Sequence, residues 1–256
     1  MKNFILKTAS FFRGLILKNK PFHKEFYRIT DLINSNVPIC FLRFGDGELM
    51  IMKNQEVSEE TQAFIIDKWT SSGNNKLGLV LKKAIAYSAK NWYFGIPCKC
   101  CNNKCKKEYL QLLKVNSQQI TYANLFVNSN YSLFKKWIKT LKRDVVLIAN
   151  KSGENNEYPF NVKKYIPMPN DCVNYYEKNE SDFIEYIKNS MKGFNNQLCF
   201  ISAGPLSEAI IYFLFLENPS NTYIDLGSSL DEYIHIKKTR PYMIEDSNYN
   251  KRVCSF

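Results

Sequence analysis

The sequence predicts an α/β fold with a Rossmann-like, mostly parallel sheet flanked by helices. Two observations support this prediction. Short, continuous apolar runs such as ICFLRF (39–44) and DVVLIAN (144–150) are typical of buried parallel strands. Segments with apolar residues at helical spacing alternate with these runs along the chain. Such alternation indicates βαβ units, whose crossovers place helices on both faces of a parallel sheet.

The individual elements follow from the same patterns. Helices are expected at 22–35, 48–55, 58–72, 75–90, 131–143, 176–194 and 206–218. Strands are expected at 39–44, 91–97, 120–127, 144–150, 161–169, 197–205 and 221–229. No repeat or low-complexity linker divides the chain. We therefore expect one domain over 31–256, preceded by an N-terminal amphipathic helical extension over 1–30.

The N-terminal extension combines an apolar face with basic flanks. At 100° per residue, one broad arc of a helix gathers Phe4, Ile5, Phe11, Phe12, Leu15 and Ile16. Such a helix can lie in the interface of an anionic membrane, or it can pack on its own domain or on a second copy, which is the commoner arrangement. Lys7 and Arg13 interrupt the apolar stretch, and no cleavage site follows. We expect a cytoplasmic protein, with peripheral contact at the inner face of the membrane as the alternative.

The chain is basic, with 35 Lys and Arg against 24 Asp and Glu and a formal charge of +11. This surplus attracts anions such as phosphate groups and anionic lipids. The lysines are scattered over many segments, and no nucleic-acid-binding motif is present. We therefore expect no nucleic-acid partner. No apolar run approaches the roughly 20 residues that span a bilayer.

Three turns follow expected strands, at 45–48, 202–205 and 225–229. Because ligands bind beyond the carboxyl ends of strands in open parallel sheets, these turns are expected to converge on one cleft. The first turn carries Asp46 and Glu48, two oxygen donors that suit Mg²⁺ or Mn²⁺. Gly45 and Gly47 are expected to let the backbone approach a ligand closely and to adopt positive φ. The alternative is a tight turn in which Asp46 only caps the next helix.

The second and third turns have features of an anion site. Gly204 permits a tight turn and Pro205 suits the first helical position, where free amides attract anions and Ser202 can add a hydroxyl. Asp225 is placed to bind a ribose or sugar hydroxyl or the metal, with Gly227 beside it. Ser228 is expected to cap a helix beginning near residue 230.

Four other charged residues lie near these turns in the sequence, and two of them, Arg43 and His235, have alternative interpretations. Arg43 can contact phosphate or form a structural salt bridge. Asp231 and Glu232 are expected to face solvent. His235 can act as a base or ligand, but a surface imidazole is the simpler interpretation.

The motifs RFGDGE (43–48), FISAGPLSEAIIYFL (200–214), IDLGSSLDEY (224–233) and TRPYM (239–243) together resemble the bacterial GT-D fold glycosyltransferases. The resemblance covers 38–242 and rests most on RFGDGE. It implies metal-dependent transfer of a sugar, as by a hexosyltransferase, from a nucleoside diphosphate sugar, with UDP expected, to a hydroxyl of a cell-surface glycan or glycoconjugate precursor. It assigns the metal to Asp46 and Glu48 and donor binding to the turns at Gly204–Pro205 and Asp225–Gly227.

Several functional alternatives stay open at this stage. A metal-dependent phosphohydrolase or phosphotransferase would use the same acids, and a basic membrane- or nucleic-acid-binding protein would use the charge excess. An inverting transferase also needs a proton acceptor. The candidates are Glu208, Asp225, Asp231 and His235.

Four of the eight cysteines crowd into eight residues, at Cys98, Cys100, Cys101 and Cys105. In a cytosolic chain, clustered thiols indicate zinc before disulfides. Because one tetrahedral site is cramped within so short a segment, zinc would need partial use of the cluster or a further ligand from elsewhere. A redox loop and a cysteine-rich surface insertion are the alternatives. Cys40, Cys172 and Cys199 are expected to be inert core residues.

Overall fold

The computed structural model describes residues 17, 19–55 and 75–256. Over this part of the chain, seven strands form one sheet in the order β3-β2-β1-β7-β6-β4-β5, and every neighbouring pair is parallel. Their bounds are β1 Cys40–Arg43, β2 Trp92–Ile96, β3 Ile120–Tyr122, β4 Val145–Asn150, β5 Val162–Met168, β6 Leu198–Ser202 and β7 Thr222–Asp225. The α/β Rossmann-like class is confirmed, and the sheet is wholly parallel.

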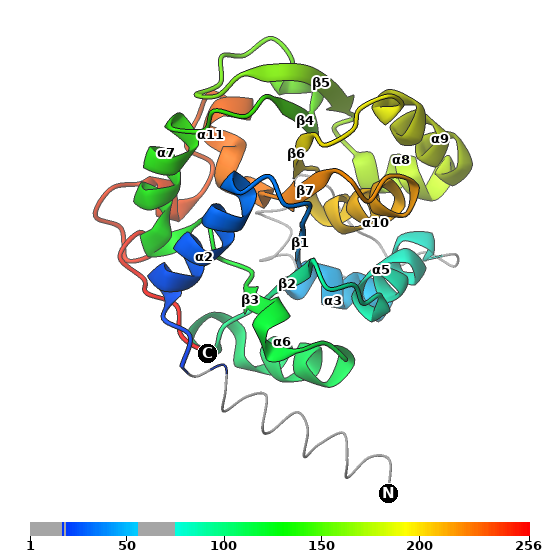
Figure 1. The fold of residues 1–256 in the computed structure, drawn as a ribbon. Coiled ribbons are helices and arrows are strands. Elements are labelled where there is room, and N and C mark those ends of the chain that lie inside the picture. The colour runs from blue at the N-terminus through cyan, green and yellow to red at the C-terminus, as the bar shows by residue number, and fades with distance from the viewer. Residues whose placement is uncertain (1–16, 18, 56–74) are drawn as a thin grey trace, which may run out of the picture.

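Helices cover both faces of the sheet, as Figure 1 shows. One layer contains α2 and α7, and the other contains α3, α5, α8, α9 and α10. The helix bounds are α2 Phe22–Asn34, α3 Asp46–Met52, α5 Lys76–Ala86, α6 Lys99–Leu112, α7 Tyr131–Lys139, α8 Cys172–Lys178, α9 Glu180–Met191, α10 Ser207–Glu217 and α11 Asp231–Ile234. Because all seven strands run parallel, their carboxyl ends lie at the same edge of the sheet.

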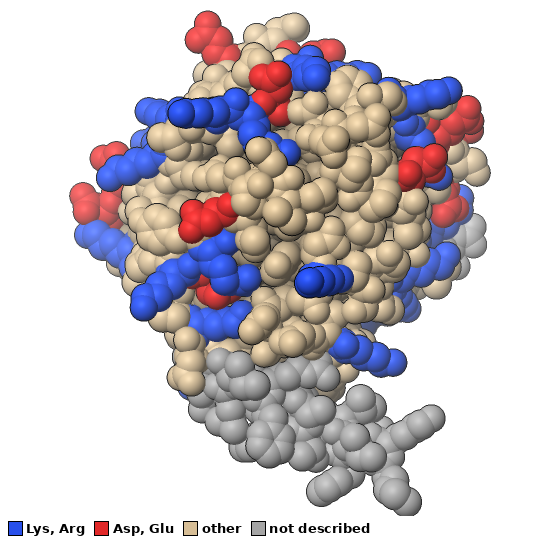
Figure 2. Space-filling view, viewed as in Figure 1, with Lys and Arg blue, Asp and Glu red and all other residues tan. Residues whose placement is uncertain are grey.

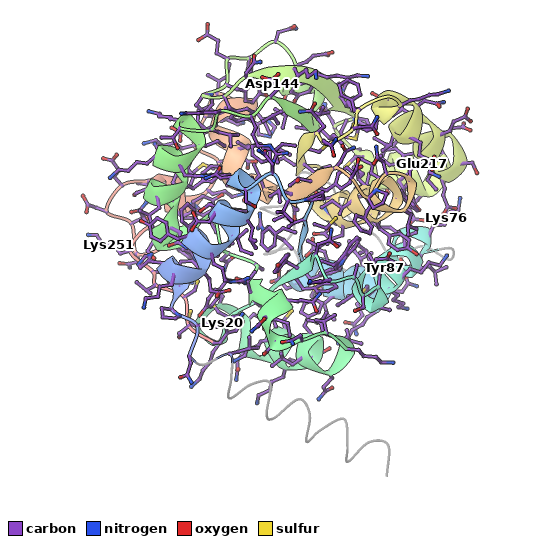
Figure 3. All side chains as sticks on the ribbon, in the orientation of Figure 1. Lys20, Lys76, Tyr87, Asp144, Glu217 and Lys251 are labelled. Carbon is purple, nitrogen blue, oxygen red and sulfur yellow. The ribbon has the colours of Figure 1, made fainter. Side chains whose placement is uncertain are left out.

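The core lies on both faces of the central strands. The strand residues of β6 before Ser202 and all those of β7 are buried, which explains the unbroken apolar run LCFI of β6. Helix α10 is apolar almost all round because it packs against β1 and β7 and also against α5 and α9. Aromatic rings fill the opposite layer, where Phe126 packs edge-on against Phe41 and stacks with Trp137. Figure 3 shows side chains filling the space around the sheet.

Two expected elements differ in extent from the structure. The expected strand 120–127 contains only Ile120–Tyr122, because the chain leaves the sheet edge at Ala123 and reaches a positive φ of 55° at Asn128. The expected helix 176–194 is two helices, α8 and α9, which meet at Asn179 with non-helical φ and ψ of −128° and 38°. The other expected elements within the described residues are present at similar positions.

The expected helix at 58–72 and the amphipathic face at residues 4–16 lie outside the described residues. Helix α2 crosses the expected boundary at residue 30, and it buries Phe26, Ile29 and Ile33 in the main core. The division into 1–30 and 31–256 itself stays a prediction. In the described part of the chain, no helix is both long enough and apolar enough to cross a membrane.

Basic side chains are spread over the surface. On the face drawn in Figure 2, Lys and Arg lie among acidic and uncharged residues around the rim, without gathering into one dense patch there. Several are paired, as in the ion pair between Lys188 and Glu217 at 2.8 Å. This distribution on the visible face matches the scattered lysines of the sequence.

Candidate active site

One cavity of about 560 Å³ opens at the carboxyl ends of the strands. Its walls come from residues that follow β1, β3, β4, β5, β6 and β7. All ten residues expected at the site line it: Arg43, Gly45, Asp46, Glu48, Ser202, Gly204, Pro205, Asp225, Gly227 and Ser228. The three turns thus meet at one place, as open parallel sheets arrange their ligand sites.

The turn after β1 is held by the first turn of α3. The Gly45 amide donates to Glu48 Oε2 at 2.6 Å, and the Gly47 amide donates to Asp46 Oδ1 at 3.1 Å. The Gly45 carbonyl accepts from the Tyr109 hydroxyl of α6 at 2.6 Å. These three hydrogen bonds fix the backbone of the turn that carries the two acids.

Gly45 and Gly47 do not have positive φ, so that expectation was wrong. Gly45 is extended, with φ of −100°. A Cβ at this position would lie 2.9 Å from Glu48 Oε2. A larger residue here would displace the Glu48 carboxylate from its hydrogen bond with the Gly45 amide, whereas the backbone conformation itself does not require glycine. Burial raises the pKa of Glu48 to about 7, and the negative charges of Asp46 and Asp225 act in the same direction.

The turns after β6 and β7 do contain left-handed glycines. Gly204 has φ of 55° and Gly227 has φ of 48°. The Asp225 carboxylate accepts from the Gly227 amide at 2.8 Å, and Ser202 Oγ donates to the Gly227 carbonyl at 2.8 Å. Ser202 therefore ties the two neighbouring turns together.

Arg43 lies between these turns and the loop after β3. Its Nε donates to the Ala123 carbonyl at 2.6 Å. A Cβ at Gly227 would collide with its guanidinium group. Its Nη1 is buried and has no hydrogen-bond partner among the described residues. A buried donor without a partner is costly in a finished core, so the position suits a group that binds an incoming anion.

Glu208 lies behind Asp225 and does not line the cavity. Both carboxylates are buried, and a neutral Glu208 hydrogen-bonds to Asp225. Burial, together with the charges of Asp225 and Glu48, raises the pKa of Glu208 well above its usual range. Arg43 opposes the burial effect at Asp225, which favours keeping the charge of the pair on that residue. Glu208 is thus a buried neighbour of the site.

Three expectations for the last turn need correction or revision. Ser228 caps no helix, because its hydroxyl pairs with the Tyr242 hydroxyl at 2.8 Å. Asp231 does not face solvent; it is buried, accepts from Thr239 Oγ1 at 2.6 Å and pairs with Arg240 at 3.6 Å. Glu232 is only partly exposed and accepts from the Tyr131 hydroxyl. Buried carboxylates persist when such partners are supplied, and those partners are remote in sequence.

His235 lines the cavity and is partly exposed. Its Nδ1 lies 3.2 Å from Ser152 Oγ. It therefore lies within the site as well as at the surface.

Several lining residues were not expected from the sequence. Asn124, Asn150 and Asn170 come from the ends of three other strands, and Arg240 and Tyr242 come from the segment after α11. The motif containing Arg240 and Tyr242 was noticed as part of the family resemblance, but no role was assigned to it. No acid or glycine beside these asparagines marks them as site residues in the sequence. Only the order of the strands in the sheet places them at the cavity.

The carboxylates of the cavity fit a hard divalent cation. Asp46 is exposed to the cavity, and Glu48 adds a second oxygen donor from the same turn. Among the described residues, the acids of the cavity form no group of three or more convergent metal ligands. Mg²⁺ and Mn²⁺ commonly take one or two carboxylates and complete their shell with water and substrate phosphates, so two protein ligands suffice.

Cys105 does not join the other three cysteines of its cluster. Its Sγ lies 3.6 Å from the Gly45 carbonyl, whereas Cys254 from the C-terminal segment joins Cys98, Cys100 and Cys101. The grouping thus uses part of the 98–105 cluster and adds one cysteine from elsewhere in the chain, the two conditions expected for a zinc site. These four thiols could hold a metal ion. Cys40 and Cys199 are buried in the sheet, and Cys172 is buried but lines the cavity.

Solved structures show the same architecture. A structure of domain of unknown function 1792, described as having a distinct glycosyltransferase fold, matches with a TM-score of 0.58 at 16% identity, over 95% of this chain and 92% of that chain. This chain has that glycosyltransferase fold. A selenomethionine-substituted structure of the same domain matches equally well. A protein from Streptococcus sanguinis, described as a new glycosyltransferase of this domain type, matches with a TM-score of 0.57 at 13% identity, over 90% of this chain and 92% of that chain.

The expected resemblance to GT-D fold glycosyltransferases is confirmed at the level of the fold. At these identities the likeness establishes the fold alone. No protein-family model matches the sequence, and no curated protein matches it.

Proposed function

We propose that this protein is a metal-dependent glycosyltransferase that moves a sugar from a nucleoside diphosphate sugar, with UDP as the nucleotide, to a hydroxyl of a glycan or glycoconjugate precursor. The observation that carries the proposal is the meeting of Asp46, Glu48, Arg43 and the two left-handed glycine turns at one cavity. The glycosyltransferase fold supports it. The cavity volume lies within the range of small-molecule sites, about 300–1,000 Å³.

Arg43 is proposed to bind the donor diphosphate. Its Nε is fixed on the Ala123 carbonyl, while its buried Nη1 has no partner among the residues described. A guanidinium held in this way can donate to a phosphate oxygen without losing freedom on binding. Gly227 has no Cβ, which leaves the space that the guanidinium occupies.

Asp46 and Glu48 are proposed to hold Mn²⁺ or Mg²⁺. When bound, such an ion stabilises the negative charge that develops on the departing diphosphate. Asp46 is exposed to the cavity, and the Glu48 carboxylate is positioned by the Gly45 amide. Asp225 is proposed to fix the Gly227 turn and to balance the charge of Arg43, because it accepts from the Gly227 amide and interacts with the guanidinium.

His235 is proposed to accept the proton of the attacking hydroxyl. Asp225 and Asp231 also line the cavity, but each carboxylate is buried and already engaged by hydrogen bonds and a cation. His235 is partly exposed, and its Nδ1 is oriented by Ser152. Histidine is the side chain that most often serves as a general base.

A screen of nucleotide sugars tests the proposal by measuring the nucleoside diphosphate released. We expect release from one donor class, only with Mn²⁺ or Mg²⁺, and faster with a hydroxyl acceptor present. Release of inorganic phosphate from many phosphate esters, without preference for a nucleotide, would instead identify a phosphohydrolase and contradict the proposal.

His235→Gln should lower kcat by about 10²–10⁴-fold, the usual contribution of general base catalysis. Asn156 packs beside α11, where its Nδ2 donates to the carbonyls of Tyr233 and Ile234. Asn156→Gln is therefore the control for packing, and it should keep kcat.

The acceptor is proposed to be a lipid-linked or surface-glycan precursor at the inner face of the membrane, because the chain is strongly basic. The N-terminal extension over 1–30 is proposed to provide peripheral contact there, with the protein otherwise cytoplasmic. Flotation with anionic and neutral vesicles tests this part of the proposal. Equal binding to both vesicle types, or to neither, would contradict it.

A further inference from the structure

The thiols of Cys98, Cys100, Cys101 and Cys254 come together where the chain passes from β2 into α6, and none of the four lines the cavity. Their sulfur atoms all lie within 4.8 Å of one another. Three of the separations are 3.1 Å for Cys98–Cys100, 4.0 Å for Cys100–Cys101 and 3.9 Å for Cys101–Cys254. A tetrahedral ZnS₄ centre with Zn–S bonds of about 2.3 Å has S···S edges of about 3.8 Å. The four sulfurs therefore have the spacing of a zinc cage.

The backbone is shaped to bring three of these thiols together. Cys98 ends the segment after β2 and immediately precedes α6. Directly after Cys101 the helix is interrupted at Asn102, with φ of −155° and ψ of 89°. The Asn102 side chain then accepts from the Cys105 amide at 3.0 Å and restarts the helix. Cys98 itself is the extended N-cap residue of α6, with φ of −83° and ψ of 168°, so its thiol lies outside the helical spacing and meets that of Cys100 at 3.1 Å.

The fourth thiol arrives on the C-terminal segment, which is held firmly in place. The Lys99 amide donates to the Ser255 carbonyl at 3.0 Å, and the Ser129 amide donates to the Arg252 carbonyl at 3.1 Å. Phe256 stacks on Tyr122 with ring centroids 4.1 Å apart. Figure 1 accordingly shows the C-terminus beside α6 and the start of α2, near Lys20 in Figure 3, whose carbonyl accepts from the Tyr122 hydroxyl.

Donors surround the sulfur atoms as they do in metal thiolate centres. Asn124 Nδ2 donates to Cys101 Sγ at 3.2 Å, and Asn128 Nδ2 donates to Cys254 Sγ at 3.3 Å. Arg252 also hydrogen-bonds to Cys101. Four thiolates around a dication leave a net charge of −2, which these amides and the guanidinium group stabilise. Neutral thiols would gain little from so many donors.

We infer that Cys98, Cys100, Cys101 and Cys254 bind one structural zinc ion. A disulfide requires an S–S distance of about 2.05 Å between two partners, whereas here four sulfurs converge without pairing. Sulfur-only tetrahedral sites select zinc or iron, and zinc is the ion of closed structural sites. Because all four positions are filled by protein, no position is open for catalysis.

The ion would attach the C-terminal segment to α6 and to the loop after β3. This loop carries Asn124, which lines the cavity, and Ala123, whose carbonyl holds Arg43. The zinc centre is thus expected to support one wall of the cavity. The inference does not depend on sugar transfer, since it rests on the thiols alone.

The metal content of the full chain, purified with reductant and without added metal, tests the inference. We expect one zinc per chain. Cys254→Ser and Cys98→Ser should each lose most of the zinc, and Cys105→Ser should keep it. Cys105 is the matched control because it lies on α6, next to the cluster in sequence, but contacts Gly45. Zinc loss in Cys105→Ser with retention in Cys254→Ser would overturn the ligand assignment.

A second measurement uses the wild-type chain and is independent of whether the variants fold. Replacement of the ion by Co²⁺ should give the thiolate charge-transfer bands and intense visible absorption of a tetrahedral CoS₄ site. A mercurial thiol reagent should release one zinc as it modifies the four cluster thiols. Iron in place of zinc, a disulfide within the cluster, or four free thiols in metal-free folded protein would each overturn the inference.

Discussion

The acid turn after β1 and the thiol cluster after β2 follow neighbouring parallel strands, yet they offer opposite kinds of ligand set. The turn provides two oxygen donors facing a cavity, whereas the cluster provides four sulfur donors that close on one another. Helix α6 touches both regions, through Tyr109 at the turn and through its first residues at the cluster. The comparison shows how the number and chemical softness of the metal ligands distinguish the two kinds of site. Two oxygen ligands leave positions on the ion free for substrate, whereas four sulfur ligands fill every position of a structural ion.

Between the two regions compared, the largest expected effect is at the acid turn. Asp46→Asn keeps an acceptor for the Gly47 amide but removes the carboxylate charge. We expect kcat/KM to fall by about 10²–10³-fold, because a bound cation contributes several kcal/mol of charge stabilisation. Steady-state release of nucleoside diphosphate measures this loss. Asp182→Asn, an exposed acid at the start of α9, is the control and should retain activity. Full activity of Asp46→Asn would remove the turn from the catalytic site.

Metal removal should separate the two regions directly. Removing the ion from the thiol cluster with a strong chelator under reducing conditions should lower the Tm, by about 2–4 °C for each kcal/mol of folding free energy that the ion contributes in a chain of this size. Added Zn²⁺ should restore the Tm, and added Mn²⁺ should not. Sugar transfer should show the opposite preference, with recovery depending on Mn²⁺ or Mg²⁺. Recovery of Tm with Mn²⁺ alone would erase the distinction between the two sites.

Arg43 tests whether the cavity is built for an anion. Arg43→Lys keeps the charge but loses the fork that joins the Ala123 carbonyl to the cavity. We expect UDP binding to weaken by about 10–100-fold, which corresponds to one charge-assisted hydrogen bond. Calorimetric titration with UDP and Mn²⁺ measures the change. Arg143 provides the control, because its guanidinium donates to the Ile33 carbonyl and does not line the cavity. Arg143→Lys should bind UDP as the wild type does.

The two left-handed glycines at 227 and 193 offer a matched pair. Both have positive φ, but a Cβ at Gly193 meets nothing within 4 Å, whereas one at Gly227 collides with Arg43. Gly193→Ala should lower the free energy of unfolding by about 1 kcal/mol through backbone strain, and Gly227→Ala by about 2–3 kcal/mol. Urea denaturation measures both. An equal loss of unfolding free energy in the two variants would mean that the Arg43 guanidinium does not clash with a Cβ at position 227.

The smallest expected effect is a pH dependence from Glu208. Its pKa is raised above the ordinary 4.5, so the stability it contributes is fully present below that pH and is lost as pH rises toward the folded value. Glu208→Gln can still donate to Asp225 but does not titrate. In metal-free protein, the variant should therefore gain stability relative to the wild type between pH 5 and pH 8. A constant difference across this range would show that Glu208 is not held neutral.

The sequence predicted the fold and the three turns that meet at the cavity, because those signals are local. Apolar runs of four to six residues mark buried strands, and the acids and glycines of the three turns follow them directly. Parallel strands place their carboxyl ends at one edge, so local signals add up to a site.

Contacts between distant segments could not be predicted in this way. Cys254 lies 153 residues from Cys101, and no spacing rule links them. The burial of Asp231 depends on Thr239 and Arg240, whose approach depends on the path after α11. The positive φ expected at Gly45 was wrong, because a glycine alone does not reveal whether backbone handedness or a close contact, here with the Glu48 carboxylate, accounts for it.

The central claim is that Asp46 and Glu48 hold a divalent ion that in turn binds a nucleoside diphosphate. Thermal shift with UDP, Mn²⁺ and both together tests it most directly in the wild type and in the Asp46→Ala, Glu48→Ala double variant. We expect a large joint stabilisation in the wild type that exceeds the sum of the separate shifts, and none in a folded double variant. An undiminished joint shift in the double variant would contradict the account.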